Sequence, residues 1–377
     1  MREVNEGGPS GTKTLLVLCS GLGLGNSTRL LGVAQALRFK FKIAPEALRI
    51  IVCTSGRAVE FWATEGRPVQ AQVVALEPYQ AMLDSAGSRI DWLGLIRPAS
   101  AGIYLRNCRK ISSFIKNNVI DLALIDSDYH CLPLLFEGIP IFILGQARDV
   151  LKRYIQYGIR ARVPLRSMAI ELLDYLFQRF IGERILVPSF EPNPPAGKSV
   201  LDVPLIVRQE FEKVSDNSAQ GPAHVLLSGS NIGSEPLLID AKRHGLPVIG
   251  TSGETSALDA RGLPRIDHSA AVIAQGGLSS ISECLARKKQ MILLPIEGHG
   301  EQMMNALEIQ RRGAGICALK LRQSPSSLLE RLSEMCGSAP NIRWPAVNGA
   351  GIVAEILLRR LRLSSGAEST SRFKALE

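Results

Sequence analysis

The 377-residue sequence predicts an α/β protein of two doubly wound domains. Three observations support this. Short apolar runs alternate with helical stretches, a polar stretch near the middle separates two rounds of this alternation, and a glycine-rich loop follows an apolar run in each half. Alternation of this kind is typical of a parallel sheet covered by helices on both faces, and this length most naturally forms two domains.

The first half contains six strand candidates and five helical stretches. The strand candidates are LLVLC, RIIVCT, VQAQVVAL, DLALI, PIFIL and RILVP. The helical stretches lie near residues 27–40, 57–65, 101–118, 130–137 and 166–180. The second round begins at HVLLSGSNIGS and continues with LPVIGTS, AAVIAQGG and MILLPI. Each run is short and apolar, as a strand buried in a parallel sheet requires.

The domain limits follow from the two stretches of alternating strands and helices. The segment RQEFEKVSDNSAQGPA has the composition of a linker between domains. We expect a disordered lead-in at 1–12, an N-terminal domain at 13–207, a linker at 208–222, a C-terminal domain at 223–349, a last helix at 350–362 and a flexible tail at 363–377.

The composition is that of an ordinary globular chain and excludes several classes. Hydrophobic residues make up 46% and charged residues 21%, and the net charge is +9, which suits an anionic ligand. Aromatic residues are only 5%, which argues against a nucleic-acid partner. The polar N-terminus does not resemble a signal peptide, and the seven cysteines lack paired spacing. We therefore expect a cytoplasmic protein.

The segment QGGLSSISE, residues 275–283, predicts a phosphate site. An apolar strand ends in a glycine pair that opens a helix, whose first N–H groups have no helical partner and whose dipole favours an anion. Gly276 and Gly277 let the backbone approach closely, and the hydroxyl of Ser280 adds a donor. Glu283, one turn further, is placed to accept hydrogen bonds from a ribose diol. The pattern predicts that residues 276–283 bind a nucleoside diphosphate.

The segment LLVLCSGLGLGNSTRLLGVAQAL contains a second glycine loop between a strand and an amphipathic helix. Gly21, Gly23 and Gly25 suggest a dinucleotide fingerprint, but its third glycine is absent. No acidic residue ends the next strand, which closes on Thr54 and Ser55. An NAD site is therefore not expected.

Together the two loops resemble those of the GT-B glycosyltransferases that use nucleotide sugars, in the branch of the peptidoglycan N-acetylglucosaminyltransferase and the plant-type enzymes. That family's donor motif is H-G-G-x-N-T-x-x-E, followed by a proline-ended strand and a D/E-Q pair, and its first loop is G-x-G-x-G-H-x-x-R. The matching positions are Gly21, Gly23, Gly25, Arg29, Gly276, Gly277, Ser280, Glu283, Pro295, Glu301 and Gln302. Gln275 and Ser279 depart from the usual His and Asn.

The resemblance implies two Rossmann-like domains, an active site in the cleft between them and a last helix that crosses back to the first domain. It implies a sugar transferred from a nucleotide diphosphate sugar, with UDP as the carrier and inversion at the sugar, and no cofactor besides this co-substrate. Glu301 and Gln302 would contact the donor sugar. Gly229, Ser230 and Asn231 would touch the diphosphate and Thr251 the base or ribose.

Asn26 occupies the position where many relatives carry the histidine that deprotonates the acceptor, and an amide cannot act as a base. Three interpretations remain open. The base comes from Asp126, Asp128 or His130 in LIDSDYH, or the donor's own phosphate serves, or the chain binds without transferring. Asp126-Ser127-Asp128 also spells D-x-D, which chelates a metal in another transferase fold. The glycine loops favour GT-B, and the scattered histidines predict no metal site.

Residues 148–187 carry several arginines interleaved with apolar residues, which predicts a peripheral contact with an anionic inner membrane surface. The alternative is a solvated helix whose apolar side packs inside the domain. For the whole chain, the alternatives to transfer are a nucleotide-sugar hydrolase or 2-epimerase of the same fold, or a non-catalytic nucleotide-binding partner subunit. The acceptor, a small molecule or a lipid-linked one, is not specified by the sequence.

Overall fold

The computed structural model describes residues 11–21, 23–78, 98–193, 199–212, 224–226, 248–249, 269, 271–296, 298–317 and 347–364. Four residues predicted to contact the donor, Gly229, Ser230, Asn231 and Thr251, lie outside these ranges, as do most of the predicted lead-in, linker and tail. Within the described residues, no helix is long and apolar enough to cross a membrane.

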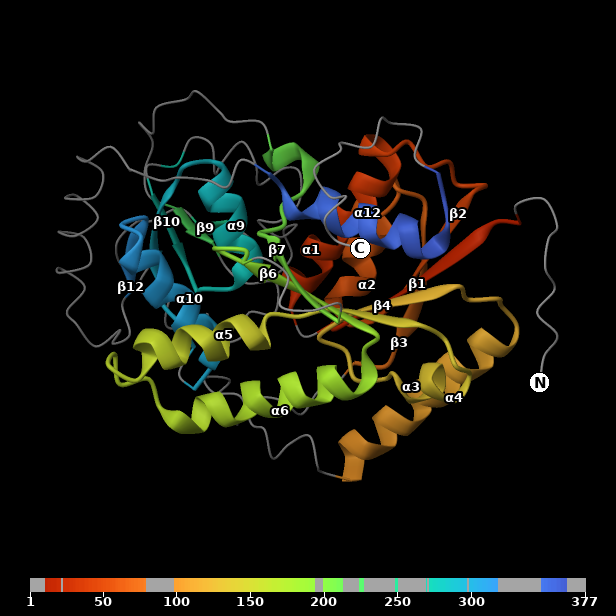
Figure 1. Cartoon of the computed structure of the whole chain (residues 1–377), viewed down its shortest axis with the longest axis horizontal. Helices are drawn as coiled ribbons and strands as arrows, with labels where there is room; N and C mark the ends of the chain where they lie inside the picture. The colour runs from red at the N-terminus through yellow and green to blue at the C-terminus, as the bar shows by residue number, and fades with distance from the viewer. Residues whose placement is uncertain are drawn as a thin grey trace.

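The N-terminal half forms a seven-stranded sheet in the order β3-β2-β1-β4-β5-β6-β7, and every neighbouring pair is parallel (Figure 1). The strands are β1 (Lys13–Cys19), β2 (Leu48–Ser55), β3 (Ala71–Leu76), β4 (Leu122–Asp126), β5 (Ile141–Leu144), β6 (Arg184–Ser189) and β7 (Val200–Pro204). The chain runs outward from β1 in one direction and from β4 in the other. The carboxyl ends of β1 and β4 therefore form the topological switch point, where open α/β sheets bind their ligands.

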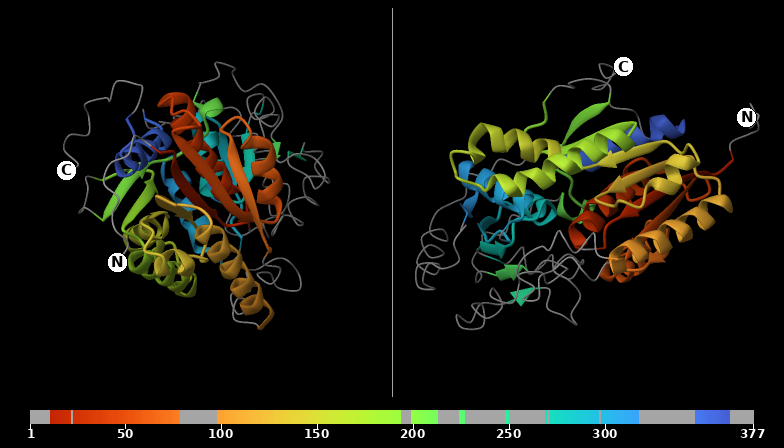
Figure 2. Two further views of the ribbon diagram at one scale, coloured as in Figure 1. Left: turned by 90° about the vertical axis from the view of Figure 1, so that its right-hand side faces the viewer. Right: turned by 90° about the horizontal axis from the view of Figure 1, so that it is seen from below.

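Helices cover both faces of this sheet (Figure 2). They are α1 (Leu24–Gln35) with a π-helical turn η1 (Ala36–Lys40), α2 (Arg57–Glu65), α3 (Pro98–Lys116), α4 (Leu132–Phe136), α5 (Ala147–Arg153) with a π-helical turn η3 (Tyr154–Gly158), and α6 (Leu165–Ile181). The side chains of β1 alternate between two hydrophobic cores, one on each face of the sheet. Leu15 and Val17 pack with α1 and α2, and Leu16 and Leu18 pack on the side of α3, α4 and α6.

The C-terminal half forms a second sheet in the order β12-β11-β10-β8-β9, again with parallel neighbours. Its strands are β8 (His224–Leu226), β9 (Val248–Ile249), β10 (Ala271–Ala274), β11 (Gln290–Leu293) and β12 (Gly315–Cys317), and its helices include α9 (Leu278–Ala286) and α10 (Gly300–Arg311). Phe211, in the 3-10 turn η4 (Gln209–Phe211) at the start of the predicted linker, is buried in the core of this half. The last helix, α12 (Gly349–Leu361), packs in the core of the first sheet with α1.

The predicted α/β class is confirmed, and all six strand candidates of the first half form strands of one sheet. Among the described helices and strands, β7, α5, α10 and β12 were not predicted, and Glu301 and Gln302 lie in α10. The helix predicted from residue 27 begins at Leu24, so Gly25 and Asn26 lie inside α1 and Gly23 is its N-cap.

Candidate functional site

The two glycine loops, 254 residues apart in the sequence, touch each other. The hydroxyl of Ser279, at the start of α9, donates a hydrogen bond of 2.6 Å to the carbonyl oxygen of Gly25 in α1. A Cβ on Gly25 would lie 3.5 Å from the same hydroxyl oxygen. Each loop follows the carboxyl end of a strand in its own sheet. The two segments predicted to bind one ligand therefore lie at one place between the sheets.

Gly276 shows why the donor loop needs a glycine. Its φ is +94°, in the region that residues with a Cβ avoid, and an added Cβ would lie 2.9 Å from the carbonyl oxygen of Gln302. The side-chain amide of Asn305 donates to the carbonyl of Gly276 at 3.2 Å. Gln302 itself accepts from the Ile296 N–H at 3.0 Å. The fold thus brings the predicted residues Gly276 and Gln302 together at the start of α10.

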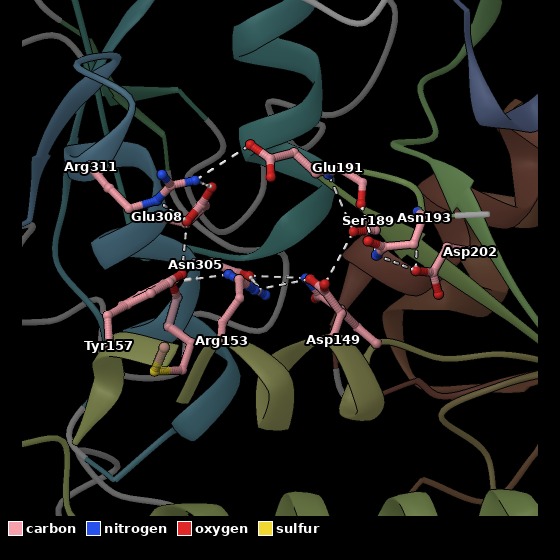
Figure 3. A network of polar contacts seen from close by, with 12 residues as sticks. Asp149, Arg153, Tyr157, Ser189, Glu191, Asn193, Asp202, Asn305, Glu308 and Arg311 are labelled. Atoms are coloured by element: carbon pink, nitrogen blue, oxygen red, sulfur yellow. Dashed lines mark hydrogen bonds and ion pairs between the residues drawn. The ribbon is translucent and has the colours of Figure 1, made fainter. Parts of the chain in front are cut away.

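Asn305, which the sequence analysis missed, is tied to the N-terminal half through a polar network (Figure 3). Arg153 of α5 donates to the side-chain oxygen of Asn305 at 2.9 Å and to the carbonyl of Met304 at 3.0 Å. Its Nε lies 2.9 Å from the carboxylate of Asp149, which also accepts from Ser189. Because Asn305 holds Gly276, this network links the position of the donor loop to α5.

Gly277 is different from Gly276. It is the N-cap residue of α9 with an ordinary φ of −65°, and nothing in the described structure lies within 4 Å of an added Cβ. No side chain caps α9 in the described residues. The N-terminal N–H groups of α9 are thus arranged as an anion site requires. Ser280 lies half-buried in the first turn of this helix.

Glu283 is buried against an arginine that the sequence analysis did not single out. Its side chain is 1% exposed, and Oε1 accepts from Nε of the fully buried Arg208 at 2.8 Å. Arg208 also reaches the second carboxylate oxygen at 3.3 Å, and its guanidinium lies over the ring of Phe211. Burial raises the pKa of the Glu283 carboxyl, and the Arg208 guanidinium opposes the rise. A ribose diol would have to share this carboxylate with Arg208.

Asn26, Arg29 and Asp126 form one network at the switch point. The guanidinium of Arg29 contacts both carboxylate oxygens of Asp126, at 2.9 and 2.6 Å, and donates to the side-chain oxygen of Asn26 at 3.1 Å. Asp126 is fully buried, and Arg29 is nearly so. Burial raises the pKa of Asp126, and Arg29 lowers it. Both oxygens of Asp126 are thus engaged with a permanent cation.

Asp128 and His130 form a separate carboxylate–imidazole pair. Oδ1 of Asp128 accepts from the backbone N–H of His130 at 2.8 Å and lies 2.9 Å from its Nδ1. Nε2 faces the side-chain amide nitrogen of Asn107 at 3.3 Å, and Asn107 accepts through its oxygen from the Glu77 N–H. That bond fixes the amide so that nitrogen faces Nε2. Nε2 therefore accepts, and Nδ1 carries the hydrogen that Asp128 receives.

Glu301 lies next to the carboxylates of α6. Its backbone N–H donates to Oε1 of Glu171 at 3.1 Å. Burial, followed by the charges of Glu301 and Asp174, raises the pKa of Glu171 from 4.5 to about 8. Asp174 accepts from the hydroxyl of Tyr129 at 3.0 Å, and burial raises its pKa to about 6. The start of α10 thus meets α6 at Glu171, a carboxyl group whose raised pKa favours the neutral form.

This arrangement makes the free energy of unfolding depend on pH through Glu171. The folded protein keeps a proton on Glu171 that the unfolded chain releases, so this contribution is complete below about pH 4.5 and is lost as pH rises to about 8. We expect Glu171→Gln to stabilise the fold by about 1–3 kcal/mol near pH 9, with little change near pH 5, in denaturant unfolding. Glu60→Gln on exposed α2 is the control. Parallel stability curves for Glu171→Gln and the unmodified chain would contradict this assignment.

Among the described residues, no group of three or more His, Cys, Asp or Glu side chains is arranged to hold a metal ion.

Comparisons with known proteins agree with this geometry. Residues 236–343 match the model of the glycosyltransferase family 28 C-terminal domain. An uncharacterized glycosyltransferase of Methanosarcina acetivorans is 22% identical over 366 residues, which cover 86% of this chain and 89% of the relative. One of Methanopyrus kandleri is 31% identical over 96 residues, which cover 25% of this chain and 28% of the relative.

Solved glycosyltransferases share the fold at low identity. The spinosyn forosaminyltransferase SpnP aligns with a TM-score of 0.55 at 13% identity, over 94% of this chain and 96% of its own. MurG of Acinetobacter baumannii aligns with a TM-score of 0.51 at 14% identity, over 92% and 99%. The chain is therefore a glycosyltransferase with the GT-B fold.

Proposed function

We propose that this chain transfers a sugar from a nucleotide diphosphate sugar, with UDP as the carrier, to an acceptor hydroxyl with inversion at the sugar carbon. The observation that carries the proposal is the contact between Ser279 and Gly25, which joins the two glycine loops and supports a ligand position shared by both. The donor motif at 275–283 lies within the family-matched segment.

In this proposal the diphosphate binds at the N-terminus of α9. The backbone N–H groups of Gly277 and its neighbours, the hydroxyl of Ser280 and the helix dipole stabilise the negative charge that develops on the departing diphosphate. Glu283 receives the ribose hydroxyls, and Arg208 keeps its carboxylate ionised and oriented. Glu301 and Gln302, at the start of α10, contact the hydroxyls of the sugar.

His130 is the proposed base. The acceptor hydroxyl replaces the long contact of Asn107 at Nε2 and passes its proton to that nitrogen, while Asp128 stabilises the resulting imidazolium. The acceptor oxygen attacks the anomeric carbon from the side opposite the diphosphate, and the bond to the diphosphate breaks with its electron pair. Asp126 is the weaker candidate, because Arg29 occupies both of its oxygens.

A thermal-shift panel with UDP, dTDP, GDP, ADP, CMP and NAD, each with and without magnesium, tests the donor site. A ligand at a concentration about 100 times its Kd raises the free energy of unfolding by about 2.7 kcal/mol. We expect UDP to stabilise the protein most. No shift with any nucleotide would contradict the proposal and would favour a structural role for the loop.

Gly277→Ala sharpens this test because the fold has room for the methyl group, whereas a phosphate at the helix N-terminus would meet it. We expect an unchanged melting temperature without ligand and about a tenfold or greater loss of UDP affinity, the effect of about 1.4 kcal/mol. Gly11→Ala, where an added Cβ also meets nothing within 4 Å, is the matched control. Unchanged UDP affinity in Gly277→Ala would place the nucleotide elsewhere.

A further inference from the structure

The outward side of α6 is an exposed apolar surface. Phe180 is 84% exposed, Leu165 72% and Leu173 67%. These residues recur with helical spacing, so they form one stripe along the helix. Figures 1 and 2 show α6 at the edge of the molecule, with α5 on its inner side. The stripe consists of Leu165, Ala169, Leu172, Leu173, Leu176 and Phe180.

The turn before α6 carries two further exposed apolar side chains. Ile155 and Ile159, in and just after η3, are 73% and 59% exposed. Scattered single apolar residues are normal on a protein surface, but a contiguous patch of this kind marks an interaction site. We call the stripe together with Ile155 and Ile159 the α6 surface.

The exposed charges within residues 154–181, which carry the α6 surface, are of one sign. The exposed Glu183 just after α6 is paired with Arg360 at 3.1 Å. All residues between Tyr154 and Ile181 are described, and the exposed charged ones among them are all arginines, namely Arg160, Arg162, Arg166 and Arg179. The two carboxylates of α6 point inward, since Glu171 accepts from the Glu301 N–H and Asp174 from the Tyr129 hydroxyl. The outward side therefore combines apolar side chains with positive charge alone.

We propose that the α6 surface docks the chain on an anionic lipid bilayer. Stable attachment of a peripheral helix needs both buried apolar area and electrostatic attraction, and this surface supplies both. A protein partner with a matching apolar face would not require that every exposed charge be basic. The proposal goes beyond sugar transfer and does not depend on it.

Docking in this orientation has a consequence for the acceptor. The inner side of α6 contacts Tyr129, which directly precedes the proposed base His130 in the sequence. It also contacts the N-terminus of α10. A helix is about 10 Å across. The bilayer surface would thus lie roughly one helix diameter from the residues around the acceptor.

Vesicle flotation of the full chain, without any nucleotide sugar, tests the proposal independently of transfer. We expect binding to vesicles of phosphatidylcholine with phosphatidylglycerol, weaker binding as salt rises, and little binding to phosphatidylcholine alone. The double variant Leu173→Glu, Phe180→Glu should lower the bound fraction about tenfold or more. Val119→Glu, at a site 82% exposed just before β4, is the matched apolar control.

A second pair of variants separates charge from apolar burial. Arg162→Glu with Arg166→Glu should weaken binding to the anionic vesicles, whereas Arg67→Glu, at an exposed position just after α2, should not. Equal binding to neutral vesicles, or no binding to either kind, would overturn the proposal. A dimer in light scattering that Leu173→Glu dissociates would also overturn it, because a second copy would then cover the surface.

Discussion

We expect His130→Gln to lower turnover by about 10²–10⁴-fold while the stabilisation by the nucleotide stays unchanged. The imidazole is oriented as a base requires, with Nδ1 bonded to Asp128 and Nε2 accepting. Glutamine retains polarity but cannot take up a proton. Initial rates with a saturating donor, measured beside the thermal shift with UDP, separate loss of chemistry from loss of binding.

Two further variants make this assignment falsifiable. Asp128→Asn should also reduce turnover, since it removes the charge that stabilises the imidazolium. Asp126→Asn should mainly weaken the fold, because it leaves the buried Arg29 without its carboxylate partner, and turnover per folded molecule should persist. Full turnover in His130→Gln together with its loss in Asp126→Asn would reverse the two roles.

The second large effect concerns stability. We expect Arg208→Met to destabilise the fold by about 3–5 kcal/mol, because Glu283 would remain buried with its main cationic partner removed. Both side chains are almost completely buried, so solvent cannot compensate for the lost partner. Denaturant unfolding at neutral pH measures the change.

The double variant Arg208→Met, Glu283→Leu isolates the pair. It removes both charges, and we expect it to regain most of the lost stability while losing affinity for UDP. Additive losses in the double variant would show that the two residues act independently. Glu283→Ala alone is a poor probe of ribose binding, since it also removes the 2.8 Å carboxylate partner of the buried Arg208.

Local sequence patterns predicted the elements whose apolar or amphipathic pattern continues without interruption over several residues. The strands around β1 and both glycine loops were found because an apolar run followed by glycines is a short-range feature. The missed strands are short and lie at the edges of their sheets. β7, VLDVP, ends in proline and contains an aspartate, as an edge strand can, and β12 has three residues at the edge of the second sheet.

Some residues of the candidate site were predicted, but not the pairs they form. Arg29 and Asp126 were each identified for separate reasons, and only the parallel register of β1 and β4 brings them together. Arg208 and Asn107 gave no local signal, since each matters only through a partner far away in sequence, Glu283 or His130. Such long-range partners depend on the packing of elements, which periodicity does not specify.

Hydrogen–deuterium exchange with and without UDP tests most directly whether the two glycine loops form one site. We expect UDP to slow exchange in residues 275–283 and also in residues 20–29, because the two segments touch through Ser279 and Gly25. Protection in neither segment, or in only one of them, would contradict the assignment of one shared donor site.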